Sequence, residues 1–596
     1  MQSIDWLIVI AYLIIALLCG IHLSRQAFGS TAGSVEDYFT GERSLSWWLA
    51  GTSMAATAFS VDTPLYVAGL VGNRGLVGNW EWWSFGLAHI IMVYLFARLW
   101  RRSEIVTDAE LSELRYGGPP AAALRGIKAF IFAVPMNCLG IGYAMLAMTK
   151  VMAVLQISAA FGVEGSPQEI KLWSVLTISA LVLVYAGLTS LWNVVATDFS
   201  QFFLALFGSF VVAIAATITV GGMQPLIDQV SAVNPDMLSF VPVGSGLQWS
   251  ALAGIPSGTF LAYVMLQWWS FRRSDGGGEF IQRMAATKTE VEAEKAAWLF
   301  NFLHYVVRPW PWIVAALAAL VLYPDLADKE LGYPLLMVDT LPPVLLGIVV
   351  TSMIAAFLST ASTLVNWGAS YLTYDLYNRF IGTSATSGEL IFVGRLASLL
   401  ILAGGGITAL SGSDVADLFR LAISLGTGPG LVLILRWFWW RINAAAELAA
   451  VVSGFMLGTL ASLVPGFAIQ DFGARLIVIT LATTFVWVST LLLTAPESDE
   501  TLDRFYTQLR PGGPGWQNQR QRTGLRPLQN LQLEGQRIVA ALLLLFGSMF
   551  TVGGFLLMRS LSGWFYLLMA VTGGFWLRYL NKQPAFPMAR PGTEDG

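Results

Sequence analysis

Apolar segments of about 20 residues follow one another along most of this chain, and each is long enough to cross a bilayer as a helix. Charged residues make up only 12% of the 596 residues, whereas a soluble domain carries about 25%. No soluble core could bury so much apolar surface, so we predict an all-α polytopic membrane protein. We place its 15 spans at residues 5–23, 45–71, 80–100, 122–156, 170–189, 191–221, 250–272, 292–323, 340–375, 388–411, 414–437, 441–465, 472–494, 536–558 and 562–580.

The orientation follows from where the basic residues lie. Asp5 opens the first apolar run and Arg25 follows it, the reverse of a cleaved secretory signal. With the N-terminus outside, the predicted inside segments hold 22 Lys and Arg and the outside segments only four. We therefore predict an uncleaved first span, the N-terminus outside and the C-terminus inside.

The chain divides by composition into a long membrane core and a shorter C-terminal region. Residues 1–494 form the predicted core, and residues 495–535, which are rich in arginine and contain Pro-Gly-Gly-Pro-Gly, form a cytoplasmic linker. Two further membrane helices follow at 536–580, and residues 581–596 form a cytoplasmic tail. The chain has no Asn-x-Ser/Thr acceptor, which favours a bacterial inner membrane.

Two predicted spans are interrupted near their centres. Residues 51–64 are small and polar between apolar ends, and Thr63-Pro64 is typical of a helix that restarts. Residues 254–259 contain a similar break, and five spans separate the starts of the two segments. Broken helices at corresponding positions indicate a transporter built from inverted repeats, with ligands bound at the unwound backbone. The alternative is a pair of proline kinks repaired by neighbouring hydroxyls.

Several polar side chains are predicted to lie at membrane depth, where each needs a partner. Ser359, Ser362 and Thr363 share one helical face, and Thr360 turns toward the next. Clustered hydroxyls and freed carbonyls could bind Na⁺, or each hydroxyl could bond to its own preceding turn. Asp198 could bind a cation, relay a proton or cap its helix.

Motifs of soluble enzymes are missing from the sequence. There is no Walker A loop, His-Glu-x-x-His, Gly-x-Ser-x-Gly or Cys/His metal spacing, and the three glycines 404–406 lie inside a span, where they favour helix packing. The net charge of −3 gives no reason to expect a nucleic-acid partner. Because no ATP-binding motif is present, uphill transport would draw on an ion gradient.

Four blocks of sequence stand in a fixed order along the chain. They are Tyr38–Trp48 with Thr57-Ala58-Phe59-Ser60, Tyr185-Ala186-Gly187-Leu188 with Thr197-Asp198 and Gln201, Ile281–Ala286, and Ala355–Thr363. Together they resemble the sodium:solute symporter family, which includes sodium–glucose, sodium–proline and sodium–sialic acid cotransporters. The resemblance covers about residues 1–490.

The resemblance implies a leucine-transporter-like fold and Na⁺-coupled solute import by alternating access, not enzymatic catalysis. A leading helix would precede two inverted five-helix repeats at about 45–221 and 250–437, followed by trailing helices at 441–494. The first implied Na⁺ site comprises backbone of Ala56, Phe59 and Ala356 with side chains of Ser359 and Thr360. A second implied site comprises Thr197, Asp198, Ser359, Ser362 and Thr363, so that one or two Na⁺ would be transported per cycle.

The implied solute site is less well matched to the family. Glu81 and Ser84 occupy positions by which sugar-transporting members hold their ligand, but Thr63 replaces a glutamine and His304 replaces a lysine. The implied substrate set is Asp62, Thr63, Glu81, Ser84, Trp268, His304 and Arg420.

A small polar solute, with a sugar or polyol favoured, is therefore the expected substrate. An amino acid or other carboxylate could bind Arg420 instead. A non-transporting solute sensor and an intramembrane enzyme are the alternatives from other classes. We expect lipid, Na⁺ and the solute as partners, and a monomer.

Overall fold

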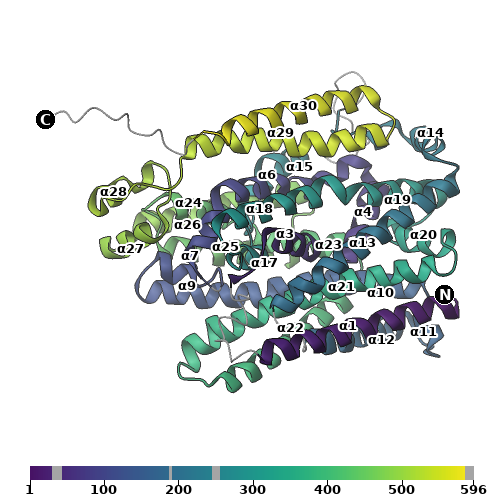
Figure 1. Cartoon of the computed structure of the whole chain (residues 1–596), viewed down its shortest axis with the longest axis horizontal. Helices are drawn as coiled ribbons and strands as arrows, with labels where there is room; N and C mark the ends of the chain where they lie inside the picture. The colour runs from purple at the N-terminus through teal and green to yellow at the C-terminus, as the bar shows by residue number, and fades with distance from the viewer. Residues whose placement is uncertain (30–42, 106, 187–190, 244–255, 584–596) are drawn as a thin grey trace.

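The computed structural model describes residues 1–29, 43–105, 107–186, 191–243 and 256–583, and these residues form helices joined by loops. The helices lie side by side in one elongated bundle (Figure 1). One end of the bundle carries α27 (Asp499–Leu509) and α28 (Gln517–Thr523) and is called the linker end below. The other carries the N-terminus and α14 (Met223–Val233) and is called the N-terminal end.

Among the described residues, 11 helices are long and apolar enough to cross a membrane. Each coincides with one of the predicted spans, which confirms the all-α membrane class. They are Leu76–Ser103, Gly118–Val154, Pro167–Tyr185, Thr197–Val220, Glu290–Leu322, Leu345–Ile381, Ser387–Ser411, Ala444–Leu463, Phe472–Leu493, Leu531–Leu556 and Ser560–Leu580.

The four remaining predicted spans are short or interrupted in the structure. The second is a pair of helices, α3 (Trp47–Thr57) and α4 (Asp62–Arg74), bent by 56° at the break between them. The eleventh is divided into α23 (Val415–Gly426) and α24 (Gly430–Phe438). The first begins with a shorter apolar stretch, Ser3–Cys19, and most of the predicted break at 254–259 lies outside the described residues. The count of 15 therefore stays a prediction.

The helices that follow one another in the first predicted repeat are α3 to α13. Beyond those already given, their bounds are α5 Trp80–Trp83, α6 Phe85–Ile91, α7 Ala97–Ser103, α8 Leu111–Arg115, α9 Gly118–Ile131, α10 Asn137–Val154, α11 Ile157–Ala160, α12 Pro167–Ala186 and α13 Leu191–Val220. The leading helix α1 spans Ser3–Gly29.

The second predicted repeat and the trailing helices continue the bundle. Their bounds are α15 Ser257–Ala262, α16 Trp268–Ser270, α17 Gly278–Ala285, α18 Glu290–Asn301, α19 Pro309–Leu322, α20 Gly332–Thr340, α21 Leu345–Ser370, α22 Ser387–Ser411, α25 Ala444–Leu463, α26 Phe472–Leu493, α29 Leu531–Leu556 and α30 Ser560–Leu580. Short π-helical segments interrupt several of them, including Phe132–Met136 and Phe302–Val307.

Small residues let the central helices approach closely, as is usual where lipid supplies no hydrophobic drive for helix association. A Cβ at Gly405 of α22 would lie 2.5 Å from the Ile141 side chain of α10. A Cβ at Gly51 of α3 would lie 2.6 Å from the Ala296 carbonyl oxygen of α18. The three-glycine run at 404–406 therefore serves helix packing, as predicted.

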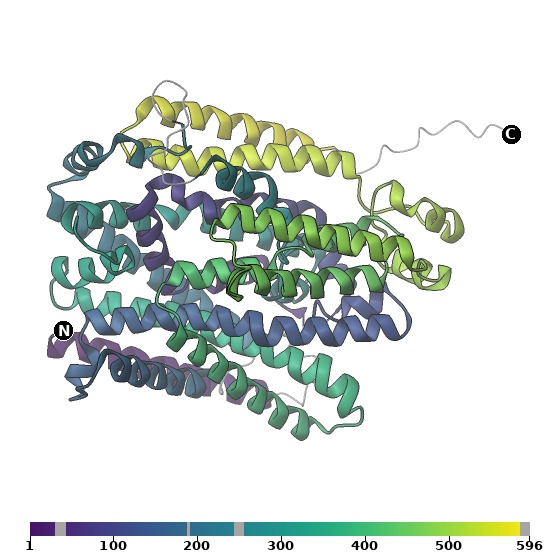
Figure 2. The ribbon, with the colours of Figure 1, turned by 180° about the vertical axis from the view of Figure 1, so that it is seen from behind.

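The C-terminal helices α29 and α30 pair along one edge of the bundle in both views (Figures 1 and 2). Phe546 and Phe550 of α29 pack against the ring of Trp80, with ring centroids 5.8 and 6.0 Å away. A Cβ at Gly553 would overlap the Trp310 ring, so α29 lies directly on α19. The hairpin is thus packed onto the core through aromatic side chains.

The predicted linker folds onto the linker end of the bundle through α27 and α28. The Arg115 guanidinium of α8 lies over the rings of Phe505 and Trp516, 5.1 and 5.0 Å from their centroids. Trp516 is fully buried, and its Nε1 donates to the Trp437 carbonyl oxygen over 2.8 Å. The linker is therefore packed against the core.

This docking predicts that Trp516→Ala will destabilise the whole protein. Removing a fully buried tryptophan leaves a cavity and costs about 3–5 kcal/mol. The unfolding temperature of the detergent-purified protein should fall, while Gln521→Ala on the exposed face of α28 should leave it unchanged. Equal unfolding temperatures for both variants would contradict the docked position of the linker.

Candidate functional site

The break between α3 and α4 lies at the centre of the bundle and leaves backbone groups without helical partners. The chain between Thr57 and Asp62 makes only local turns, with the Phe59 amide bonded to the Ala56 carbonyl over 2.9 Å. Side chains from two other helices reach these carbonyls. Arg308 donates to the Ala55 oxygen over 3.1 Å and Thr360 to the Thr57 oxygen over 3.1 Å. Freed carbonyls and a hydroxyl therefore meet at one point.

The first predicted Na⁺ set is distributed around this point. Ala56 and Phe59 flank the break, and Thr360 of α21 contacts it directly through Thr57. Ala356 and Ser359 are buried on the same helix, α21. Ser359 itself bonds to the Asp198 carboxylate over 2.5 Å, so it joins the first set to the second.

Asp198 of α13 is the centre of the second predicted set, and it is fully buried. Its two carboxylate oxygens accept hydrogen bonds from Ser359 and from Ser53 of α3, each over 2.5 Å. Thr197 accepts from the Tyr185 hydroxyl over 3.2 Å instead. Ser362 bonds back to the Ser359 carbonyl over 3.2 Å, which is the local alternative considered from the sequence.

Arg283 of α17 supplies the positive charge in this second set. Its guanidinium lies 3.8 Å from Asp198 and donates to Ser53 over 3.1 Å and to Thr363 over 2.9 Å. In this arrangement a guanidinium stands among the oxygens that were predicted to hold a second cation. A Na⁺ could share them only after Arg283 moves away.

A central cavity of about 170 Å³ adjoins the break. Thr57, Ser60 and Thr360 line it, and so do Asp62, Thr63 and His304 from the predicted substrate set. The buried Oδ1 of Asp62 and Nδ1 of His304 have no hydrogen-bond partner within the described structure. These unpartnered atoms can bind a polar solute, because leaving them unbonded in an apolar interior costs free energy.

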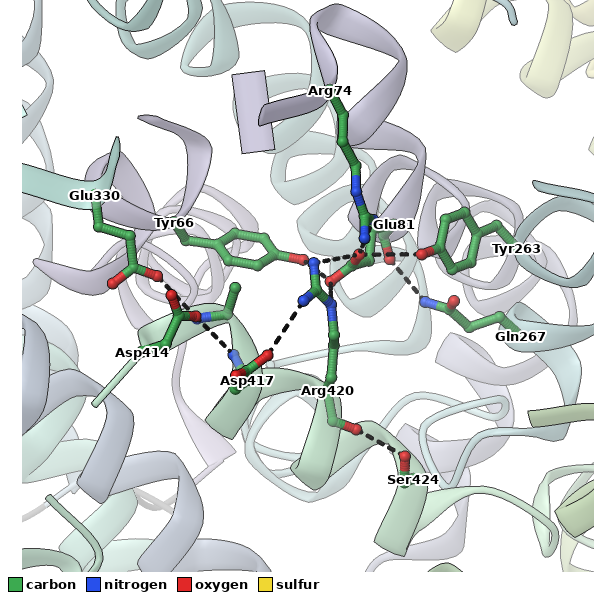
Figure 3. Close-up of polar contacts among 11 residues, drawn as sticks. Tyr66, Arg74, Glu81, Tyr263, Gln267, Glu330, Asp414, Asp417, Arg420 and Ser424 are labelled. Carbon is green, nitrogen blue, oxygen red and sulfur yellow. Dashed lines mark hydrogen bonds and ion pairs between the residues drawn. The ribbon is translucent and has the colours of Figure 1, made fainter. Parts of the chain in front are cut away.

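The other four predicted substrate residues, Glu81, Ser84, Trp268 and Arg420, are not part of this cavity wall. Arg420 of α23 pairs with Glu81 of α5 through two contacts of 2.9 and 3.1 Å (Figure 3). Ser84 is buried, and Trp268 bonds to its own preceding turn at Val264 over 2.9 Å.

Glu81 is fully buried, and side chains from α4, from α23 and from residues 263–267 donate hydrogen bonds to it (Figure 3). We call this group the Glu81 cluster. The donors are Tyr66 at 2.9 Å, Tyr263 at 3.0 Å, Arg74 at 3.2 Å and Arg420, while Gln267 donates to the Glu81 carbonyl oxygen over 2.7 Å.

The Glu81 cluster separates the central cavity from a second cavity toward the N-terminal end. Tyr66 lines the central cavity, whereas Arg74 and Arg420 line the second one, which has a volume of about 560 Å³. Glu81 bonds to all three side chains. The Glu81 cluster therefore links the walls of the two cavities.

Breaking this buried pair from one side is predicted to destabilise the protein. Glu81→Gln and Arg420→Gln should each lower the free energy of unfolding by up to about 3 kcal/mol, because each leaves the other residue with only a weaker charged contact of 3.2 Å, Arg420 with Asp417 or Glu81 with Arg74. The double variant should lose at least about 1 kcal/mol less than the sum of the single losses. Unfolding temperatures of the four proteins measure this, and strictly additive losses would show that the pair does not form.

A second charged group joins α10 to the start of α23. Lys150 of α10 contacts Asp328 at 2.7 Å and Glu330 at 2.5 Å. Glu330 also accepts from the Val415 and Ala416 amides at the N-terminus of α23, over 3.1 and 3.0 Å. Carboxylate oxygens of Asp328, Glu330 and Asp414 all lie within 4.8 Å of one another. Burial raises the pKa of Glu330 to about 7, although Lys150 opposes the shift.

The raised pKa of Glu330 predicts a pH-dependent stability. Between pH 4.5 and 7 the folded protein holds a proton that the unfolded chain releases, so the unfolding temperature should fall as pH rises through this window. Glu330→Gln should flatten that dependence, and Asp228→Asn on an exposed helix face should not. Parallel pH curves for all three proteins would exclude a proton on Glu330.

Comparison with known proteins bears directly on this geometry. The model of the sodium:solute symporter family matches residues 38–454. The chain belongs to the sodium:solute symporter family. It is a sodium-coupled solute symporter, and the Na⁺ and solute predicted from the sequence are the transported species of this family. This confirms the resemblance that the sequence blocks indicated.

Individual relatives span most of the symporter. The sodium/glucose cotransporter of Vibrio parahaemolyticus is 26% identical over 530 residues, covering 84% of this chain and 92% of that protein. Sodium/glucose cotransporter 2 of Rattus norvegicus is 24% identical over 511 residues, covering 78% and 72%. A solved structure of a Na⁺-coupled sialic acid symporter in a substrate-bound outward-open state has a TM-score of 0.64 at 19% identity, covering 83% of this symporter and 99% of that chain. That likeness shows a shared fold.

Several residues at the site were not predicted as site residues from the sequence. Arg283 lies within one of the sequence blocks that carried the resemblance, but its contacts with Asp198 and Thr363 depend on three helices meeting. Tyr66 lies four residues after Asp62, one turn along the same helical face, so its spacing could have placed it beside the cavity. Tyr263 gives no comparable signal.

Proposed function

We propose that the symporter binds its coupling Na⁺ at the break between α3 and α4, with Ala56, Phe59, Ala356, Ser359 and Thr360 as the ligands. The contact between Thr360 and the Thr57 carbonyl carries this proposal, because it sets a hydroxyl of α21 against freed backbone oxygens. Oxygen ligands suit a hard cation. Since Thr57 and Thr360 also line the central cavity, Na⁺ bound there would stabilise the conformation that receives the solute.

The solute site is proposed to be the central cavity, with Asp62, Thr63 and His304 in its wall. A small polar organic molecule suits a cavity of about 170 Å³. The names of the glucose cotransporters support a sugar or polyol, whereas the arginines of the cavity wall support a carboxylate. Glu81 and Arg420 would act on the solute's path, not in this cavity, whereas Ser84 and Trp268 line neither cavity.

We propose that the Glu81 cluster is the outer gate of an alternating-access cycle. With the N-terminus outside, as the basic residues indicate, the N-terminal end of the bundle faces outward and the linker end faces the cytoplasm. Separation of Arg420 from Glu81 would then join the central cavity to the larger one beside it. A multi-pass monomer of 15 spans in a bacterial inner membrane, with inverted repeats at 45–221 and 250–437, completes the proposal.

Sodium should raise the unfolding temperature of the purified symporter relative to potassium at equal ionic strength. A ligand at 100 times its dissociation constant stabilises the folded state by about 2.7 kcal/mol. Thr360→Ala should abolish this shift, because it removes a proposed ligand. Ser370→Ala is the matched control, since Ser370 lies on the same helix and bonds to its own preceding turn over 2.7 Å.

A transport measurement distinguishes one Na⁺ site from two. If Ser362 and Thr363 hold a second Na⁺, replacing both by alanine should lower the number of Na⁺ transported per solute from two to one in reconstituted vesicles. An unchanged ratio would exclude the second site. A sodium shift that survives Thr360→Ala would reject the first site.

A further inference from the structure

Three arginines line the central cavity: Arg272, Arg273 and Arg308. Two of them already have polar partners within the protein. Arg273 forms an ion pair with Glu279, and Arg308 donates to the Ala55 carbonyl and contacts His304 over 3.1 Å. Arg272 is different, because its guanidinium is surrounded mainly by aromatic rings.

The guanidinium of Arg272 lies over Phe132, Trp367 and Phe271, at 5.1, 5.6 and 5.7 Å from the ring centroids. Only 6% of the residue is exposed, and its Nε has no hydrogen-bond partner. Within the described parts of the chain, no carboxylate forms an ion pair with it. Contacts with aromatic faces stabilise a buried cation, but they do not offset the full cost of removing it from water.

The position of Arg272 is fixed by its neighbours in the chain. Its backbone amide donates to the Gly426 carbonyl over 2.8 Å, and the Ser274 hydroxyl donates to the Gly430 carbonyl over 2.8 Å. Asp275, three residues on, is held by Arg436 at 2.6 Å and by Trp437 at 3.0 Å. The backbone that carries Arg272 is thus anchored at the break between α23 and α24.

From this arrangement we propose that the transported solute carries a carboxylate, which pairs with Arg272. The proposal rests on the central cavity being the solute site. A guanidinium offers parallel N–H donors that match the two oxygens of a carboxylate. Phe271 and Trp367 beside it, and Phe419 elsewhere in the wall, give the cavity an apolar surface suited to the organic part of the solute. The substrate class is a small organic carboxylate.

The experiment measures Na⁺-dependent thermal shifts of the full chain with two matched panels of compounds. One contains small organic carboxylates, and the other contains the corresponding primary amides together with uncharged sugars and polyols. At least one carboxylate should raise the unfolding temperature in sodium, and its amide should bind at least tenfold more weakly. Chloride added to a sodium HEPES buffer tests whether a simple inorganic anion satisfies Arg272.

Variants of Arg272 then assign the effect to this side chain. Arg272→Gln should weaken carboxylate binding at least tenfold, and Arg272→Lys should weaken it less, because the charge remains. Arg526→Gln, on an exposed part of the linker, is the matched control and should leave binding unchanged. The shift caused by Na⁺ alone reports whether each variant is folded.

Four other results would overturn the proposal, and a fifth would reject the proposed Na⁺ site. If uncharged sugars or polyols bind and no carboxylate does, the proposal is overturned, although the cavity remains the solute site. A carboxylate that binds Arg272→Gln as tightly as the unaltered protein also overturns it. The proposal is also overturned if no carboxylate in the panel binds. The same holds if chloride alone raises the unfolding temperature and this rise depends on Arg272. Loss of the Na⁺ shift in the unaltered protein would instead reject the proposed Na⁺ site.

Discussion

The interruption between α3 and α4 is the constraint on which the rest of the centre depends. Backbone groups freed inside an apolar bundle need partners, because no water is available to bond them. The protein supplies Thr360 from α21 and Arg308 from the end of the π-helical segment before α19. Both side chains belong to the second predicted repeat, whereas the break belongs to the first. One local defect thus requires the two halves of the chain to meet there.

Buried charges form comparable links on either side of this break. Glu81 bonds with Arg420 beside the larger cavity, and Asp198 lies with Arg283 among the hydroxyls of α3 and α21. Each pair joins helices that are distant in sequence. Such pairs add little net stability when intact but cost several kcal/mol when one partner is removed. An intact pair therefore holds the helices in one arrangement, and an arrangement that separates the two charges without new partners is costly. This suits a protein that changes between a few discrete states.

The cavity wall contains charge that the protein does not neutralise by itself. Arg273 and Glu279 compensate each other, but Arg272 is held among aromatic rings. The segment that follows it, residues 273–278, is tightly packed: a Cβ at Gly278 would overlap the Trp367 ring.

Apolar segment length was enough to predict the membrane class and 11 of the spans, because a helix in lipid must satisfy its own backbone along about 20 residues. The break before Pro64 and the hydroxyl cluster of α21 were also visible, since both are local patterns. What the sequence could not provide was the partner of each buried charge. Glu81, assigned to the solute by resemblance, pairs with Arg420, and Arg283 stands beside Asp198. Those pairings depend on how separate helices pack, and only the tertiary structure decides them.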